Sequence, residues 1–212
     1  MDENAKILLE KYIDVAQEKG DSIDDIVDGY IYSLKKINEE QVYFFRNQYT
    51  YRYEYSEDFR TEVYDNPSYM KKYMTGLALS MFLWPQHRDL HREFRKFLAQ
   101  MSSEQRKGYL EIGAGCGLYA VEAINTHAFS HYDFVDISET SLMLTKRMIN
   151  ETAGAEKKSF YCKDVMYFSG SDYSLIVANG IIQTLENPEI FLAKCCSMIS
   201  ADGYFFLTAS LN

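Results

Sequence analysis

The stretch Tyr109-Leu110-Glu111-Ile112-Gly113-Ala114-Gly115-Cys116-Gly117 decides the fold of this chain. It starts as a short apolar run, which is typical of a buried strand, and passes directly into a glycine-rich loop. A helix-like segment from Leu118 to Asn125 follows at once. A strand, a glycine-rich turn and a helix N-terminus in this order predict a cradle for a nucleotide-type ligand, because glycines allow positive φ and a close approach of the backbone to the ligand.

The spacing of the glycines indicates which ligand the cradle fits. A dinucleotide-binding loop has the pattern G-x-G-x-x-G/A. Here the third small position of that pattern is the bulky Leu118, and the third glycine, Gly117, comes one residue early. The spacing therefore disfavours a nicotinamide-dependent dehydrogenase. An acid, Glu111, also precedes the first glycine, so the loop reads E-x-G-x-G-x-G.

From Gly108 onward, apolar strand patterns alternate with helical patterns. We expect strands at 109–112, 132–136, 158–163, 173–178 and 204–209, and helices at about 117–126, 139–150 and 188–200. Ser138 and Asn187 are suited to cap the last two helices, and Pro188 suits the first helical position. This alternation predicts an α/β fold with a Rossmann-like, mostly parallel sheet that carries helices on both faces.

Polar residues stand where three of these strands end. Asp136, Asp164 and Asn179 follow the second, third and fourth strands in turn. Ligands of such sheets bind beyond the carboxyl ends of the strands, which makes all three candidates for binding. Each also has an ordinary alternative, because an acid after a strand often serves only as the N-cap of the next helix. Their joint occurrence with the glycine loop favours the binding hypothesis.

The run E-I-G-A-G-C-G resembles motif I (D/E-x-G-x-G-x-G) of the class I S-adenosylmethionine-dependent methyltransferases. The runs F-V-D-I-S and S-L-I-V-A-N-G strengthen the resemblance, which covers about residues 105–212. It implies S-adenosylmethionine as cofactor, S-adenosylhomocysteine as product, and in-line methyl transfer to an O, N or C nucleophile of a small molecule. The residues that it implies for cofactor binding are Glu111, Gly113, Ala114, Gly115, Gly117, Asp136, Ile137, Asp164, Val165 and Asn179.

The resemblance also implies roles for these residues. The glycines would approach the methionine portion of the cofactor, and Glu111 would bind its amino group. Asp136 would hold the ribose and Asp164 the adenine amine, with the Val165 amide at a ring nitrogen. Asn179 would face the amino-acid end.

Two departures from the family pattern stand out. Many small-molecule members carry a His pair after the fourth strand, whereas this chain has Gln183 and Thr184 there. No catalytic base is therefore identified, and transfer would depend on positioning and desolvation. The family fold also continues past the fifth strand into a C-terminal β-hairpin that is missing here, so we expect a compact variant or a truncated form. Both departures leave open a second function, a non-catalytic cofactor-binding sensor or scaffold.

The N-terminal part reads as helical and aromatic-rich, and we expect a cap or substrate region at 1–104 and a cofactor-binding domain at 105–212. A first helix is expected at 3–19. A second is expected to begin after a Ser22 cap, with Lys35 and Lys36 near its end. Two more are expected from Pro67 to Trp84 and from Pro85 to Gln100. Aromatic residues crowd 43–73, and the alternation from Tyr49 to Tyr55 fits either a strand or a helix.

These aromatics either form a lid over a small-molecule site or simply pack against the second domain. On the lid hypothesis, Tyr69 and Tyr73 are candidates for substrate binding, together with Gln183. The sequence alone leaves both alternatives open.

Composition narrows the partners. The net charge of -9 argues against nucleic acid or an anionic membrane as the main partner. The four cysteines form no C-x-x-C pair, which suits a reducing cytoplasm and gives no support to a zinc site. His87 and His91 have i, i+4 spacing but no third ligand, so we expect a surface or capping role and no metal.

The remaining expectations concern location and assembly. The acidic N-terminus has no apolar signal-peptide core, and the apolar run 77–84 is too short to span a bilayer, so a cytoplasmic location is expected. His127 and His131 precede the second strand and are expected to be structural. The apolar segment 204–209 lacks lysine and proline, so as an edge strand it predicts a homodimer or a covering segment.

Overall fold

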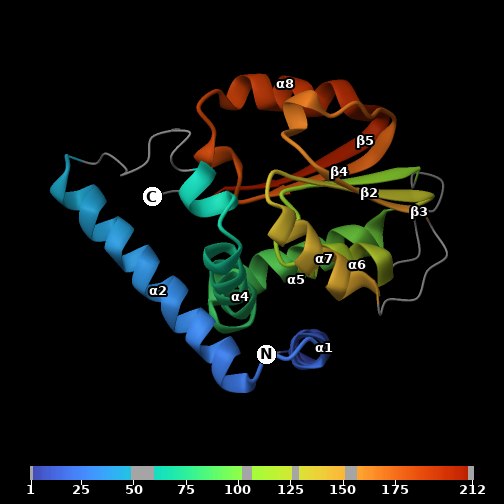
Figure 1. The fold of residues 1–212 in the computed structure, drawn as a ribbon. Coiled ribbons are helices and arrows are strands. Elements are labelled where there is room, and N and C mark those ends of the chain that lie inside the picture. Colours follow the sequence, from blue (N-terminus) through green and yellow to red (C-terminus); the bar gives the residue numbers. More distant parts are fainter. Residues whose placement is uncertain (1, 49–59, 102–106, 126–128, 151–156, 210–212) are drawn as a thin grey trace. The chain divides into compact units, whose positions relative to one another are not determined.

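The structure, a computed structural model, describes residues 2–48, 60–101, 107–125, 129–150 and 157–209 (Figure 1). Its chain divides into two compact units, Met1–Leu90 and His91–Asn212. The division falls inside helix α5 (Pro85–Gln100). The segment Tyr49–Tyr55, for which the sequence favoured neither strand nor helix, lies outside the described residues, as does His127.

In the first unit the elements are α1 (Glu3–Glu18), α2 (Ile23–Arg46), a π-helical turn (Arg60–Tyr64), α4 (Pro67–Leu83) and the start of α5. In the second they are β1 (Gly108–Ile112), α6 (Leu118–Asn125), β2 (His131–Asp136), α7 (Glu139–Asn150), β3 (Lys157–Cys162), β4 (Tyr173–Asn179), α8 (Pro188–Met198) and β5 (Ile199–Thr208). Short 3-10 turns cover Val165–Tyr167 and Ile182–Thr184. Among the described residues, no helix is both long and apolar enough to cross a bilayer.

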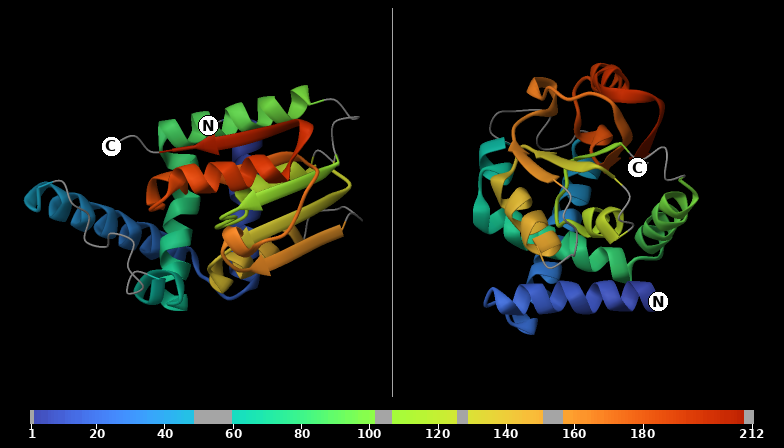
Figure 2. Two further views of the ribbon diagram at one scale, coloured as in Figure 1. Left: turned by 90° about the horizontal axis from the view of Figure 1, so that it is seen from above. Right: turned by 90° about the vertical axis from the view of Figure 1, so that its right-hand side faces the viewer.

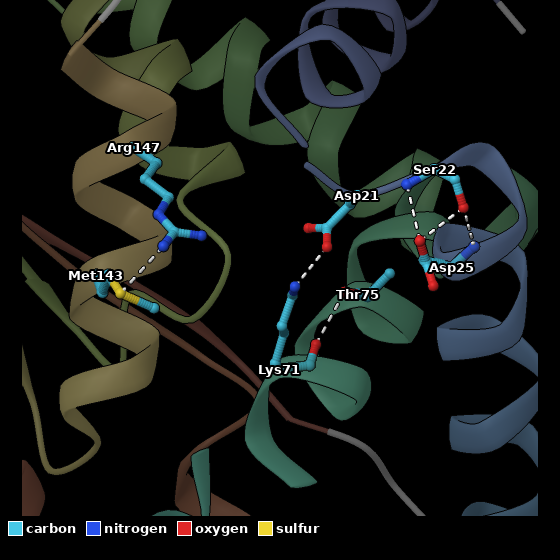
Figure 3. Close-up of polar contacts among 7 residues, drawn as sticks. All are labelled: Asp21, Ser22, Asp25, Lys71, Thr75, Met143 and Arg147. Atoms are coloured by element: carbon cyan, nitrogen blue, oxygen red, sulfur yellow. Dashed lines mark hydrogen bonds and ion pairs between the residues drawn. The ribbon is translucent and has the colours of Figure 1, made fainter. Parts of the chain in front are cut away.

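Capping side chains fix where the helices of the first unit begin. Ser22 accepts from the Asp25 amide at 3.1 Å and the Asp25 carboxylate accepts from the Ser22 amide at 2.8 Å, which is the expected capping box (Figure 3). The carboxylate of Asp21 also accepts from the Lys71 ammonium of α4. One expectation was wrong: α2 continues to Arg46, so Lys35 and Lys36 lie within it and not near its end.

Small residues bring α2 and α4 close together. A Cβ on Gly76 would lie 1.7 Å from Oγ of Ser33, and one on Gly29 would lie 2.9 Å from Cγ2 of Thr75. The two helices therefore pack backbone to side chain at these positions, which no larger residue would allow. This crossing forms the centre of the first unit.

The second unit is built on a five-stranded sheet of order β3-β2-β1-β4-β5, in which every pairing is parallel. Helix α8 covers one face and α6 and α7 cover the other (Figures 1 and 2). The expected α/β fold is confirmed. Strand order reverses between β1 and β4, so the loops after these two strands meet at the point where such sheets bind ligands.

Some element ends differ from expectation. The last helix was expected to run to 200 and the last strand to begin at 204. In the structure α8 ends at Met198 and β5 begins at Ile199. The register of β4 and β5 shifts between Tyr173 and Leu175. Ser138 caps α7 through a 3.4 Å bond from the Ser141 amide, as expected. Asn187 occupies the N-cap of α8, as expected, but its side chain makes no capping hydrogen bond.

Candidate functional site

The loop after β1 has the backbone that its glycines allow. Gly113, Gly115 and Gly117 have φ of 68°, 56° and 79°, values that residues with a Cβ rarely adopt. The Gly113 amide donates to the Val135 carbonyl of β2 at 2.7 Å, which ties the loop to the neighbouring strand. A Cβ on Gly113 would lie 2.6 Å from Cδ1 of Ile181, the side chain just beyond β4. The loops after β1 and β4 are thus in contact, as the strand order requires.

Gly117 serves packing as well as loop geometry. A Cβ there would lie 2.8 Å from Cα of Thr145 in α7. The Thr145 hydroxyl in turn donates to the Gly115 carbonyl at 3.2 Å. Helix α7 therefore holds the glycine loop in shape from one side.

Glu111 is a buried carboxyl at the end of β1. It is 3% exposed, and its Oε2 accepts a 2.6 Å hydrogen bond from the Tyr109 hydroxyl. Burial raises the pKa of Glu111 to about 8, with a further rise from the nearby Asp136, while the hydrogen bond from Tyr109 acts in the opposite direction. A buried acid with its pKa raised this far, at the mouth of a glycine loop, is a strong candidate for contact with a cationic ligand.

Asp136 joins the end of β2 to the glycine loop. Its Oδ1 accepts from the Ser138 amide at 2.8 Å and its Oδ2 from the Gly115 amide at 3.4 Å. It is 8% exposed, and burial raises its pKa to about 6 although the backbone hydrogen bonds lower it. The structure therefore brings Glu111, the glycines and Asp136 together in one place.

Two other expected cofactor residues, Asp164 and Asn179, already make hydrogen bonds to other groups of the chain. Asp164 is exposed and caps the 3-10 turn at Val165, its Oδ1 accepting from the Met166 amide at 2.8 Å. Oδ1 of Asn179 accepts from the Thr208 hydroxyl of β5 at 3.2 Å. The ordinary capping alternative is thus realised for Asp164, and its role toward a cofactor stays a prediction, as do those of Ala114 and Ile137.

The candidates for substrate binding lie in different parts of the chain. Gln183 is exposed and its amide donates to the Gly180 carbonyl at 2.9 Å, while the neighbouring Thr184 hydroxyl donates to the Ile181 carbonyl at 2.7 Å. Tyr69 and Tyr73 belong to α4 of the first unit, where their rings stack with centroids 6.0 Å apart. Their roles stay predictions.

Three residues of the site escaped the sequence reasoning: Tyr109, Thr145 and Ile181. Tyr109 offered a signal, because residues two apart on a strand share a face and a tyrosine beside a buried acid suggests a hydrogen bond. Thr145 and Ile181 gave none, since their contacts with the loop depend on tertiary packing.

The histidines gather into no metal site. His87 Nδ1 lies 2.8 Å from the Ser80 hydroxyl in the first unit. His91 is 5% exposed, and its Nε2 lies 3.7 Å from Oε1 of Glu122 in the second unit, so of the two roles expected for it the one at the surface was wrong. His131 stands at the start of β2, the end remote from the candidate site, as expected. Within the described ranges, no group of three His, Cys, Asp or Glu residues has a geometry suited to a metal ion.

The part of the chain that resembles known proteins is the part that forms the sheet. Residues 110–205 match the family described as a methyltransferase domain. Malonyl-(acyl-carrier protein) O-methyltransferase 2 of Ilyobacter polytropus is 28% identical over 102 residues, which are 48% of this chain and 38% of that protein. The chain thus matches well under half the length of this relative.

Solved structures share the fold at low identity. The N-methyltransferase NodS from Bradyrhizobium japonicum WM9, solved in complex with S-adenosyl-L-homocysteine, has a TM-score of 0.50 at 17% identity, over 58% of this chain and 61% of that chain. The mitomycin 7-O-methyltransferase MmcR has a TM-score of 0.56 at 9% identity, over 73% and 43%. At these identities the likeness concerns the fold alone.

Proposed function

We propose that residues 110–205, which match a methyltransferase domain, form a class I domain that binds S-adenosylmethionine at the glycine loop and transfers its methyl group to a small-molecule nucleophile. The observation that carries the proposal is the contact of Asp136 with the Gly115 amide, beside the buried Glu111. It places two carboxyl groups and the glycine backbone at the reversal point of the sheet, where ligands of such folds bind.

The residues present fit this cofactor. S-adenosylmethionine carries a positive ammonium and a positive sulfonium. Glu111 and Asp136 are both buried carboxyl groups whose pKa values burial raises. A cation bound beside them would offset that burial and favour their ionised forms.

On this proposal the bound cofactor supplies an electrophilic methyl group on its sulfonium. Glu111 accepts hydrogen bonds from the ammonium, and Asp136 from the ribose hydroxyls. The glycine loop lets backbone amides reach the methionine portion, and Asp164 and Val165 contact the adenine. The chain's part in the reaction is then to bind, orient and exclude water.

The substrate class rests on charge and on one relative. A net charge of -9 is unfavourable for nucleic acid and for anionic membranes. The relative from Ilyobacter polytropus is named for O-methylation of a malonyl group on acyl-carrier protein. Oxygen nucleophiles are therefore the first to test, ahead of nitrogen and carbon, with a malonyl thioester as the first compound. Tyr69, Tyr73 and Gln183 are the proposed substrate contacts.

A second function is favoured by one observation. The side chains of Gln183 and Thr184 both donate to carbonyls of their own loop, where a catalytic base is expected in related enzymes. A sensor or scaffold that binds the cofactor without transferring its methyl group would need no catalytic base at this place.

Binding and turnover separate the alternatives. Titration calorimetry should give micromolar or tighter binding of S-adenosylhomocysteine and none of NAD. Transfer of a radiolabelled methyl group from S-adenosylmethionine to a compound in a small-molecule panel should then show that the chain is an enzyme. Binding without transfer to any member of a wide panel would favour the sensor, and NAD binding without S-adenosylhomocysteine binding would overturn the proposal.

A further inference from the structure

Tyr109 and Glu111 form a fixed pair on one face of β1. Tyr109 is 0% exposed, and aromatic rings surround its own: the centroids of Phe129, Tyr132 and Phe134 lie 5.4, 5.6 and 6.1 Å away. Its hydroxyl donates to Oε2 of Glu111 at 2.6 Å. Because the ring is held by close packing, the hydroxyl keeps a set position and orients the carboxyl.

The other groups around Glu111 give it no positive charge. The charge of Glu111 interacts electrostatically with Asp136 of β2, with Cys116 of the glycine loop and with Tyr119 of α6. Burial raises the pKa of the Cys116 thiol to about 12 and also raises that of Tyr119, so both stay neutral donors at most. Among the described residues, Tyr109 is the one that donates a hydrogen bond to this carboxyl, and Oε1 receives none.

We infer that Tyr109 is a positioning residue for the cofactor's amino-acid end, and that Glu111 loses a proton when the cofactor's ammonium binds beside it. The inference rests on the proposed function. In the free protein Glu111 is a neutral acid hydrogen-bonded by Tyr109. On binding, its O–H bond breaks, the proton passes to solvent, and the resulting carboxylate accepts from the ammonium through Oε1 and from Tyr109 through Oε2.

The position of the proton has a measurable consequence. The pKa of the free Glu111 is raised to about 8, so at pH 6 to 7 most of the protein must lose this proton in order to bind. Affinity then rises with pH, by at most tenfold per unit, and levels off near pH 8. A hydroxyl donor stabilises the carboxylate more than the neutral acid, so the hydrogen bond from Tyr109 lowers the pKa of Glu111.

The first test uses the unmodified chain and S-adenosylhomocysteine. Calorimetry at pH 6.5 in two buffers of different ionisation enthalpy counts the protons released on binding. We expect close to one proton at pH 6.5 and a smaller number at pH 8.5. The variant Glu111→Gln, which has no proton to lose, should bind more weakly and release close to none.

The second test compares two buried tyrosines. Tyr109→Phe should bind S-adenosylhomocysteine about tenfold more weakly at pH 6.5, with the deficit shrinking as the pH rises to 9. Tyr132→Phe is the matched control, because Tyr132 is also 0% exposed but its hydroxyl donates to the Ala123 carbonyl of α6. It should show the affinity and the pH profile of the unmodified chain.

The outcomes separate the inference from the proposed function. If the unmodified chain fails to bind S-adenosylhomocysteine, the proposed function fails and this inference with it. If it binds but releases no proton at pH 6.5, the inference alone is overturned. A deficit in Tyr109→Phe that is constant from pH 6.5 to 9 would also overturn it, as a purely structural effect. Should Tyr109→Phe not fold, the proton count and Glu111→Gln decide.

Discussion

The hydroxyl of Tyr173, at the start of β4, donates a 2.5 Å hydrogen bond to Oδ2 of Asp133 on β2. Strand β1 lies between these two strands, so the bond reaches across it. Gly108 makes the room, since a Cβ there would lie 2.9 Å from Cδ1 of Tyr173. Both partners are buried, with exposures of 2% and 8%. This polar clamp therefore links β4 to β2 across β1.

Removing this clamp should destabilise the second unit. Tyr173→Phe leaves the buried Asp133 carboxyl without its donor, which costs about 1 to 3 kcal/mol of unfolding free energy. Chemical denaturation monitored by circular dichroism measures the loss. In a double-mutant cycle with Asp133→Ala, which removes the acceptor, the two losses should be less than additive, because the residues share one interaction. Full additivity would mean that the bond contributes nothing.

Asp136 should matter for the cofactor where Asp133 does not. Asp136→Ala should weaken S-adenosylhomocysteine binding by about 2 to 4 kcal/mol, because charge-assisted bonds to the ribose are lost. The control is Asp133→Asn on the same strand, which should bind normally once folded. The pKa of Asp136 is raised to about 6, so the affinity that depends on its carboxylate should fall as the pH drops below 6. Equal losses in both variants would contradict the assignment.

Gly117 should tolerate no side chain. Gly117→Ala combines a positive φ of 79° with a Cβ 2.8 Å from Cα of Thr145, so it should cost about 3 kcal/mol or more of unfolding free energy. Gly180→Ala is the control: its φ is 63°, but its Cβ would first meet Nε2 of Gln183 at an ordinary 3.6 Å. That variant should lose only about 1 to 2 kcal/mol. Similar melting temperatures for the two variants would refute the close packing of the loop on α7.

The cofactor-free protein should become less stable as the pH rises. The pKa of Glu111 is about 8 in the folded protein against 4.5 for a glutamate in the unfolded chain, so the folded state holds this proton more tightly. The stability it contributes is full below pH 4.5 and is lost as the pH rises through 8, by about 5 kcal/mol. Glu111→Gln removes this dependence and should melt at a higher temperature than the unmodified chain at pH 9. Parallel melting curves of the two proteins from pH 5 to 9 would contradict it.

The edge of the sheet gives a prediction on assembly. Among the described strands, β5 pairs with β4 on one side and with none on the other. An apolar strand in this position favours pairing with a second copy of the chain. Light scattering across micromolar concentrations should therefore reveal a dimer. A monomer at every concentration, with rapid deuterium exchange at the amides of Tyr204 to Thr208, would show that the edge stays open.

Much of the second unit could be predicted from the sequence, because its signals are local. The run from Tyr109 to Gly117 specified a strand, a glycine loop and a helix start, and the structure confirms this order. Positive φ at Gly113, Gly115 and Gly117 follows from residue type alone. Element ends were less certain in both units: β5 of the second starts at Ile199 and α2 of the first runs to Arg46, since packing extends or shortens elements beyond their local patterns.

What the sequence by itself determined is the order of strands and helices and the identity of the polar residues at the strand ends, because hydrophobic period and glycine spacing are written in neighbouring positions. Only the tertiary structure decided which of them meet. Three contacts join residues far apart in the chain: the hydrogen bond of Asp136 with Gly115, the packing of Gly117 against Thr145, and the hydrogen bond from Tyr173 to Asp133. Such contacts depend on strand order and side-chain packing, which no local pattern encodes.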